Sequence, residues 1–152
     1  MDRCEQAFNY HHSGYNCAQS VLMSFADVTH VDEATGFAVA GGMGGGMGGT
    51  HQEVCGAISG GVLALGLAFP YTDSQRPEDK RRIMALSKEF MKRFQERFGG
   101  LTHWGDLLKS RVEATEENTP AAVRVGASKH CDIMIVTAVE IVEQMLKEEG
   151  VL

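Results

Sequence analysis

The sequence predicts an all-α protein, a single-domain bundle of about five to six helices with a glycine-rich loop. Apolar residues recur at helical spacing through most of the 152 residues, whereas the strict alternation that is typical of a strand is scarce. Glycine and proline residues separate the periodic stretches and mark where helices begin and end. Because no repeat or shift in composition divides the chain, we expect one core and one domain over residues 1–152.

The first predicted helix begins near Asn16, whose side chain suits the N-cap position. Cys17, Val21 and Phe25 then recur every four residues and give this helix one apolar stripe. A second, short helix is predicted over residues 31–40, because acidic residues and a threonine open that segment.

A capping box predicts the next helix start. Thr50 and Glu53 have the spacing at which a threonine hydroxyl and a glutamate satisfy each other's backbone N–H groups, so we expect a helix over residues 51–69. This helix would place Cys55 one turn inside its start, four residues after His51. Their side chains would then share one helix face, where they could form an ion pair or bind one metal ion.

The second half of the chain predicts a long helix over residues 77–98, with Pro77 in its first turn and a glycine pair after its end. Residues 102–120 are polar apart from one apolar stretch, which predicts a short helix followed by a mobile acidic loop. The last helix is predicted over residues 121–149, with Cys131 on its apolar face.

Composition excludes several classes of function. A formal net charge of −6 disfavours binding to nucleic acid. The apolar stretch over residues 54–69, which carries no charge, is shorter than the ~20 residues that cross a bilayer, so no membrane span is predicted. The N-terminal segment is polar where a signal peptide would be apolar. We therefore expect a cytoplasmic protein.

The four cysteines are the residues with the clearest chemical potential. In a cytoplasmic chain they are expected to be thiols, metal ligands or a redox pair rather than structural disulfides. Cys17, Cys55 and Cys131 lie on three predicted helices and can converge in a bundle core. Each can also be a small packing residue, as we expect for Cys4. Cys17 stands at a helix start, where its pKa is expected to be lowered.

The glycine run before Thr50 has two interpretations. Gly44, Gly46 and Gly49 match the dinucleotide-binding pattern, although a run this rich in glycine matches many patterns. Glycines also let backbone approach a neighbour closely, and the predicted helix start at Thr50 offers N–H groups to an anion or to sulfur. We take these four residues as the candidate cofactor-binding set.

Four stretches of the chain resemble the proteins named for their C_GCAxxG_C_C pattern, which are regarded as redox-active. They are SGYNCAQSVL at 13–22, the glycine run with VCGAISG at 41–67, EFMKRFQERFGG at 89–100 and HCDIMIVTAVEIVE at 130–143. The resemblance implies a small all-helical protein with four characteristic cysteines, of which Cys17, Cys55 and Cys131 are present. Trp104 stands where the family's remaining cysteine would be.

The resemblance implies a redox site but leaves its chemistry open. A metal ion or iron–sulfur cluster would take the three thiolates Cys17, Cys55 and Cys131, with His51, His103, water or Cys4 completing the site. Without a metal, two thiols would cycle with a disulfide. Either way we expect an oxidoreductase-type protein, dependent on thiols or on a metal.

Two other functions are consistent with the sequence. One is a non-catalytic homo-oligomeric binding or assembly module in which the cysteines only pack. The other is a small-molecule binder that uses the predicted helix start at Thr50. We also expect a homodimer, because a bundle with a glycine-lined face often associates, and a redox partner protein.

Overall fold

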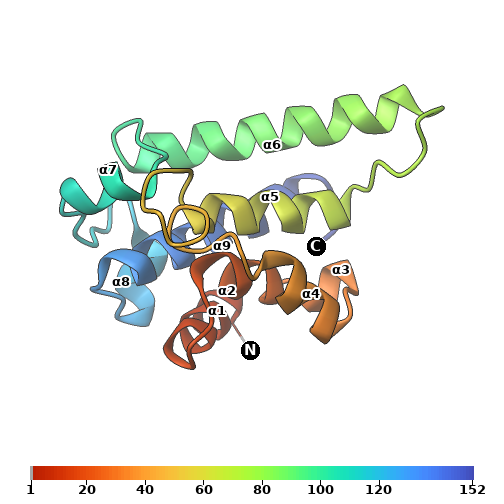
Figure 1. Ribbon diagram of the computed structural model, residues 1–152. Helices are drawn as coiled ribbons and strands as arrows, with labels where there is room; N and C mark the ends of the chain where they lie inside the picture. Colours follow the sequence, from red (N-terminus) through yellow and green to blue (C-terminus); the bar gives the residue numbers. More distant parts are fainter. Residues whose placement is uncertain (1) are drawn as a thin grey trace.

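The computed structural model describes residues 2–152, and within them the protein is all-α, as the sequence predicts (Figure 1). The helices of this range are α1 (Arg3–His12), α2 (Cys17–Met23), α3 (Ala26–Thr29), α4 (Glu33–Ala40), α5 (Gly56–Ala68), α6 (Pro77–Arg97), α7 (Trp104–Lys109), α8 (Pro120–Val125) and α9 (His130–Glu148). These nine exceed the predicted five to six, because α1 was not predicted and turns divide other segments into short helices. Within the described residues, one isolated antiparallel bridge pairs Val54 with His103.

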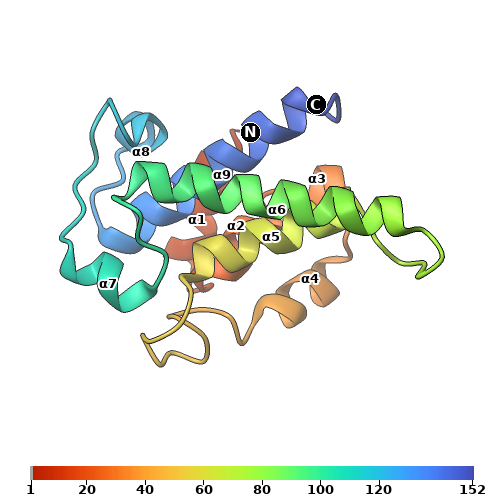
Figure 2. The same ribbon diagram turned by 90° about the horizontal axis from the view of Figure 1, so that it is seen from above.

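Helix α5 lies in the middle of the fold, with α6 on one side and α2 on the other (Figures 1 and 2). Its glycines make both approaches possible. A Cβ added at Gly60 would lie 2.6 Å from the carbonyl oxygen of Ala18, and one added at Gly61 would lie 2.4 Å from the ring of Phe90. Small residues on opposite faces of α5 thus let α2 and α6 pack at short range.

Helices α9 and α6 supply much of the remaining core. Apolar side chains of α9 are buried on most of its circumference, which is typical of a helix covered on several sides. Helix α6 is amphipathic and buries Leu86, Phe90 and Phe94 against its neighbours, followed by Phe98 at its C-cap. No helix within residues 2–152 is long and apolar enough to span a membrane.

The helix predicted over residues 51–69 begins later than its capping box indicated. Its first residue is Gly56, and Cys55 is the N-cap. The Thr50 hydroxyl donates instead to the carbonyl of Gly46 at 2.7 Å, and His51 has a left-handed backbone with φ of 62°. Hydrogen bonds within the turns of the glycine run therefore form in place of the predicted capping box. The predicted helix start is wrong.

The prediction of one helix over residues 121–149 is also wrong, because the structure has two helices in this range. Gly126, with φ of 75°, ends α8 in the left-handed conformation that glycine adopts easily. Helix α9 then begins anew at His130. The break places Cys131 in the first turn of a 19-residue helix rather than in the middle of a longer one.

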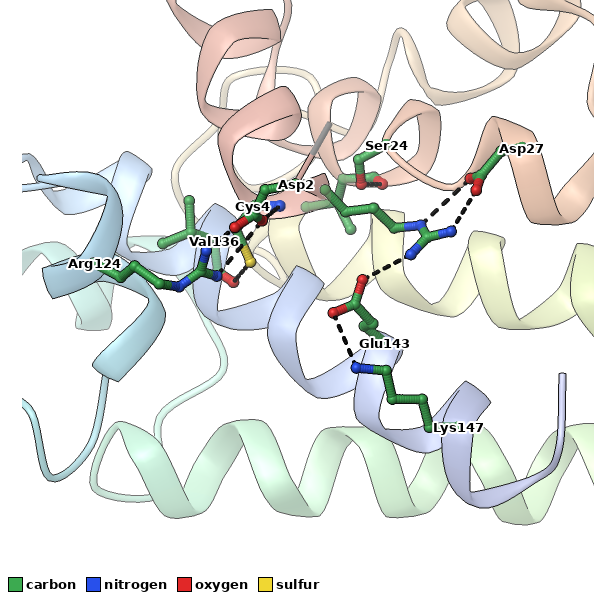
Figure 3. Close-up of polar contacts among 10 residues, drawn as sticks. Asp2, Cys4, Ser24, Asp27, Arg124, Val136, Glu143 and Lys147 are labelled. Carbon is green, nitrogen blue, oxygen red and sulfur yellow. Dashed lines mark hydrogen bonds and ion pairs between the residues drawn. The ribbon is translucent and has the colours of Figure 1, made fainter. Parts of the chain in front are cut away.

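Polar contacts fasten α1 to the rest of the fold (Figure 3). The Arg3 guanidinium bridges Asp27 of α3 and Glu143 of α9, with 2.8 Å to the latter. Asp2 accepts a hydrogen bond from the Cys4 backbone N–H and pairs with Arg124 of α8. These contacts fix the direction of α1, whose last turn carries His11 and His12.

Candidate functional site

Two of the three candidate cysteines meet in space, together with a histidine that the sequence did not indicate. Cys17 is the first residue of α2 and Cys131 is the second residue of α9. Their sulfur atoms and a ring nitrogen of His11 all lie within 4.8 Å of one another. The site therefore forms where the end of α1 meets the starts of α2 and α9.

The position of Cys17 is fixed by a capped helix start. Asn16 accepts a hydrogen bond from the Gln19 N–H at 2.9 Å, and the Gln19 side chain accepts one from the Asn16 N–H at 3.0 Å. The Asn16 amide also donates to the carbonyl of Gly41 at 3.0 Å. A Cβ at Gly44 would lie 2.4 Å from that of Asn16, so the glycine run packs directly on the cap before Cys17.

Cys55 lies next to this group without joining it. Cys55 is 1% exposed, and the next residue, Gly56, packs on Cys17, where an added Cβ would lie 3.1 Å from the Cys17 Cβ. A charge on Cys55 would raise the pKa of Cys17, so the two thiols are near neighbours. The sulfur of Cys55 is not among the donor atoms that cluster within 4.8 Å in the described chain.

Cys131 is the thiol that the site favours as a thiolate. Interaction with the Cys17 thiol is the largest effect, and it lowers the pKa of Cys131 to about 6. A positive charge on His11 would lower the pKa of Cys131 further, and the Trp104 indole N–H also lowers it, whereas partial burial opposes both effects. The unpaired N–H groups in the first turn of α9 also favour a negative sulfur. Cys131 is partly exposed, so a reactant can approach it.

The other two thiols are held in the neutral form. The hydrogen bond between Cys17 and Cys131 has the largest effect and, together with burial, raises the pKa of Cys17 well above its ordinary value. Burial raises the pKa of Cys55 to about 12, although N–H groups at the start of α5 oppose the shift. The expectation that Cys17 has the lowered pKa is therefore wrong: Cys17 is 4% exposed, and its thiol stabilises the charge of Cys131 instead.

A buried carboxylate orients the histidine of the site. Asp132 is 2% exposed, and its two oxygens contact His11 Nδ1 at 2.7 Å and His12 Nε2 at 2.9 Å. An ionised carboxylate only accepts hydrogen bonds, so each histidine donates an N–H to it. His12 is exposed and His11 is partly exposed, and together they cover the buried carboxylate.

Trp104 covers the same site from α7. Its ring stacks on His51 with centroids 3.9 Å apart and contacts the edge of His130 at 5.5 Å. Burial lowers the pKa of His130, whose ring nitrogens have no hydrogen-bond partner within residues 2–152. Trp104 stands at the position where the family resemblance placed a cysteine, and its indole N–H lowers the pKa of Cys131.

The two histidines predicted as metal ligands lie outside the sulfur group. His51 is not on the helix face of Cys55, because α5 begins only at Gly56. Its ring lies on Trp104 instead. His103 is exposed, with Nδ1 3.0 Å from the hydroxyl of Thr102.

The residues predicted to bind a cofactor shape the glycine run itself. Gly46, with φ of 70°, passes close to Trp104, and a Cβ there would lie 3.0 Å from the tryptophan Cβ. The Gly49 N–H donates to the Gly44 carbonyl at 3.1 Å, and the Thr50 N–H donates to Met47 at 3.1 Å. No helix begins at Thr50, so the predicted anion site loses the helix start on which it depended.

Sequence reasoning missed His11 and Asp132. The signal for Asp132 was an acidic residue directly after Cys131, at the head of an otherwise apolar stretch. Such a carboxylate must find partners when its helix is buried. The histidine pair at 11–12 supplies the partners of this carboxylate, but His11 and Asp132 are 121 positions apart in the sequence.

Comparison with protein families gives a match over most of the chain. The family model described as "Putative redox-active protein (C_GCAxxG_C_C)" matches residues 15–145. The matched range includes Cys17, Cys55 and Cys131, whereas Cys4 and His11 precede it. Searches of curated proteins and of solved structures gave no match.

Proposed function

Because the chain belongs to the C_GCAxxG_C_C family, we propose that Cys131 and Cys17 form a dithiol that reduces disulfides by exchange. The observation that carries the proposal is the pairing of the two sulfurs within 4.8 Å, one as a thiolate and one as a protonated thiol. Reduction of a disulfide by thiol–disulfide exchange requires a nucleophilic thiol and a second thiol beside it.

The first step is attack by the Cys131 thiolate on a substrate disulfide. A bond forms between Cys131 Sγ and one substrate sulfur, while the substrate S–S bond breaks and its other sulfur leaves as a thiolate. The leaving thiolate takes a proton from solvent. This step needs an accessible sulfur with a low pKa, and in this site Cys131 has both properties.

The second step closes the internal disulfide. Cys17 gives its proton to His11 and attacks Cys131 Sγ, which breaks the mixed disulfide and releases the second substrate thiolate. Two electrons have then passed from the dithiol to the substrate. Asp132 holds the His11 ring at 2.7 Å and stabilises the imidazolium that forms.

The arrangement favours thiol exchange over an iron–sulfur cluster. Such clusters are held by several cysteine thiolates. Here Cys55 stands outside the cluster of donor atoms, and an indole N–H faces Cys131 where a further thiolate would be needed. We assign no chemical step to Cys55, which is the N-cap of α5 and precedes Gly56, the residue that packs on Cys17.

The proposed reaction needs a reducing supply of electrons and a disulfide to reduce. We therefore propose a cytoplasmic setting and a protein partner that carries the substrate disulfide. The partly exposed Cys131 is the point of contact for that partner.

Trapping of the mixed disulfide tests the proposal. With Cys17→Ser, a disulfide substrate such as oxidised glutathione should add one glutathione to Cys131 and remain there, because the resolving thiol is gone. Wild type should release the adduct and form the internal disulfide, Cys131→Ser should form no adduct, and Cys4→Ala should behave as wild type. An adduct that Cys131→Ser retains would refute the assignment.

A further inference from the structure

We propose that His11, Cys17 and Cys131 are the three protein ligands of a zinc site with an open fourth position. The three donor atoms come from three different helices and all lie within 4.8 Å of one another. In a tetrahedral zinc site, ligands of these types lie about 3.5–3.8 Å apart.

Asp132 already makes the contact that would orient the histidine ligand. A histidine that binds zinc usually donates its other ring N–H to a carboxylate, which fixes the tautomer and the plane of the ring. His11 Nδ1 contacts the 2% exposed Asp132 at 2.7 Å, so its Nε2 is the nitrogen available to a metal. The buried negative charge of Asp132 adds to the attraction for a cation.

The donor set selects the class of metal. Two cysteine sulfurs and one imidazole suit zinc and similar soft or borderline ions, whereas magnesium and calcium prefer oxygen ligands. Trp104 offers Cys131 an N–H but no ligand atom, so the described residues leave the fourth place to water or to an incoming thiol. Three protein ligands with an open position are typical of reactive rather than purely structural zinc sites.

A neighbouring group must be separated from this one by experiment. The donor atoms of His11, His12 and Asp132 also lie within 4.8 Å of one another. Their nitrogen and oxygen atoms already bond to each other, and His12 has a side chain that is 45% exposed. The two sulfurs make the first group the stronger site for zinc.

Zinc binding and thiol exchange use the same two sulfurs. Zinc bound to Cys17 and Cys131 prevents their oxidation, and the internal disulfide removes both sulfur ligands. This antagonism rests on the proposed function, whereas the zinc site itself does not.

The test is a metal titration of the reduced, metal-free protein. Zinc is added against a chromophoric chelator, and cobalt serves as a spectroscopic probe because thiolate-to-cobalt charge transfer reports sulfur ligation. Wild type should bind one ion with sulfur-to-metal absorption. Cys131→Ser and Cys17→Ser should each weaken binding at least about a hundredfold, and His11→Gln about ten- to a hundredfold.

The controls distinguish the two donor groups. Cys4→Ala and His51→Gln should bind as wild type does, and circular dichroism should show that every variant keeps its helix content. Wild type oxidised beforehand to the internal disulfide should bind no zinc.

Two results would overturn the zinc site. One is a wild type that binds no ion. The other is binding that His12→Gln abolishes while Cys131→Ser leaves it intact, because this would place the ion on His11, His12 and Asp132. Mixed-disulfide trapping in the presence of a chelator continues to report the exchange reaction, so the two proposals can fail separately.

Discussion

Cys4 packs against helix α9 and Cys131 lies on that helix, yet their thiols differ in chemistry. Cys4 is 2% exposed and its sulfur donates to the carbonyl of Val136 at 3.6 Å, in the middle of α9 (Figure 3). Burial, followed by the charges of Glu143 and Glu140, raises the pKa of Cys4 to about 12. Cys131 lies at the start of the same helix, where donors lower its pKa to about 6. Position along a helix and neighbouring donors, rather than residue type, decide which thiol reacts.

The largest effect expected from this comparison is in alkylation by iodoacetamide at pH 7. A pKa of about 6 makes Cys131 about nine-tenths thiolate, whereas a pKa of about 12 leaves Cys4 almost wholly protonated. Wild type should show one fast-reacting thiol, at least about a hundredfold faster than the others. Cys131→Ser should lose the fast phase and Cys4→Ala should keep it. A fast phase that persists in Cys131→Ser would contradict the predicted difference in reactivity between the two thiols.

The sulfur site also depends on the close approach of α5 to α2. Gly60→Ala sets a methyl group 2.6 Å from the Ala18 carbonyl and should lower the free energy of unfolding by about 1–3 kcal/mol. Gly66→Ala, on the same helix with no neighbour within 4 Å, is the matched control and should raise it by up to about 1 kcal/mol. Urea unfolding measures both. Equal effects of the two substitutions would contradict the packing account.

The pH dependence of alkylation separates the donors of Cys131. In metal-free buffer the rate should rise with pH through a midpoint near the pKa of about 6 and then level off, because the thiolate is the reacting form. Trp104→Phe removes an N–H that stabilises the thiolate, so the midpoint should move up by about one unit. Cys17→Ala removes the larger effect and should move it further. A midpoint that neither variant moves would exclude these donors.

The smallest effect is expected in the Cys4 region. Arg3→Gln breaks the pairs with Asp27 and Glu143 and should destabilise the fold by about 1 kcal/mol or less, since such pairs are partly exposed. The alkylation rate of Cys131 should not change. A large loss of that rate would show that the two regions are coupled through α1.

Much of the fold could be predicted from periodicity. The line of Phe90, Phe94 and Phe98 predicted α6, and the capped repeat from Asn16 predicted α2. The start of α5 could not be predicted, because Thr50 bonds within the turns of the glycine run and does not cap a helix. The break at Gly126 was missed for a similar reason: a single left-handed residue interrupts an apolar pattern that continues on both sides.

The site was predictable only in part. The structure brings Cys17 and Cys131 together, whereas Cys55 stands outside their cluster and the predicted ligands His51 and His103 lie elsewhere. His11 reaches the site through Asp132, a contact between residues 121 positions apart that no local pattern contains. The expected homodimer and redox partner stay predictions.

The central claim is that Cys17 and Cys131 form the redox pair. Its most direct test is oxidation of the metal-free protein by one equivalent of a disulfide oxidant, followed by mass spectrometry of the unreduced peptides. The account predicts a crosslink between the peptides of Cys17 and Cys131, with Cys4 and Cys55 recovered as thiols. A crosslink that involves Cys4 or Cys55, or oxidation that only joins separate chains, would contradict it.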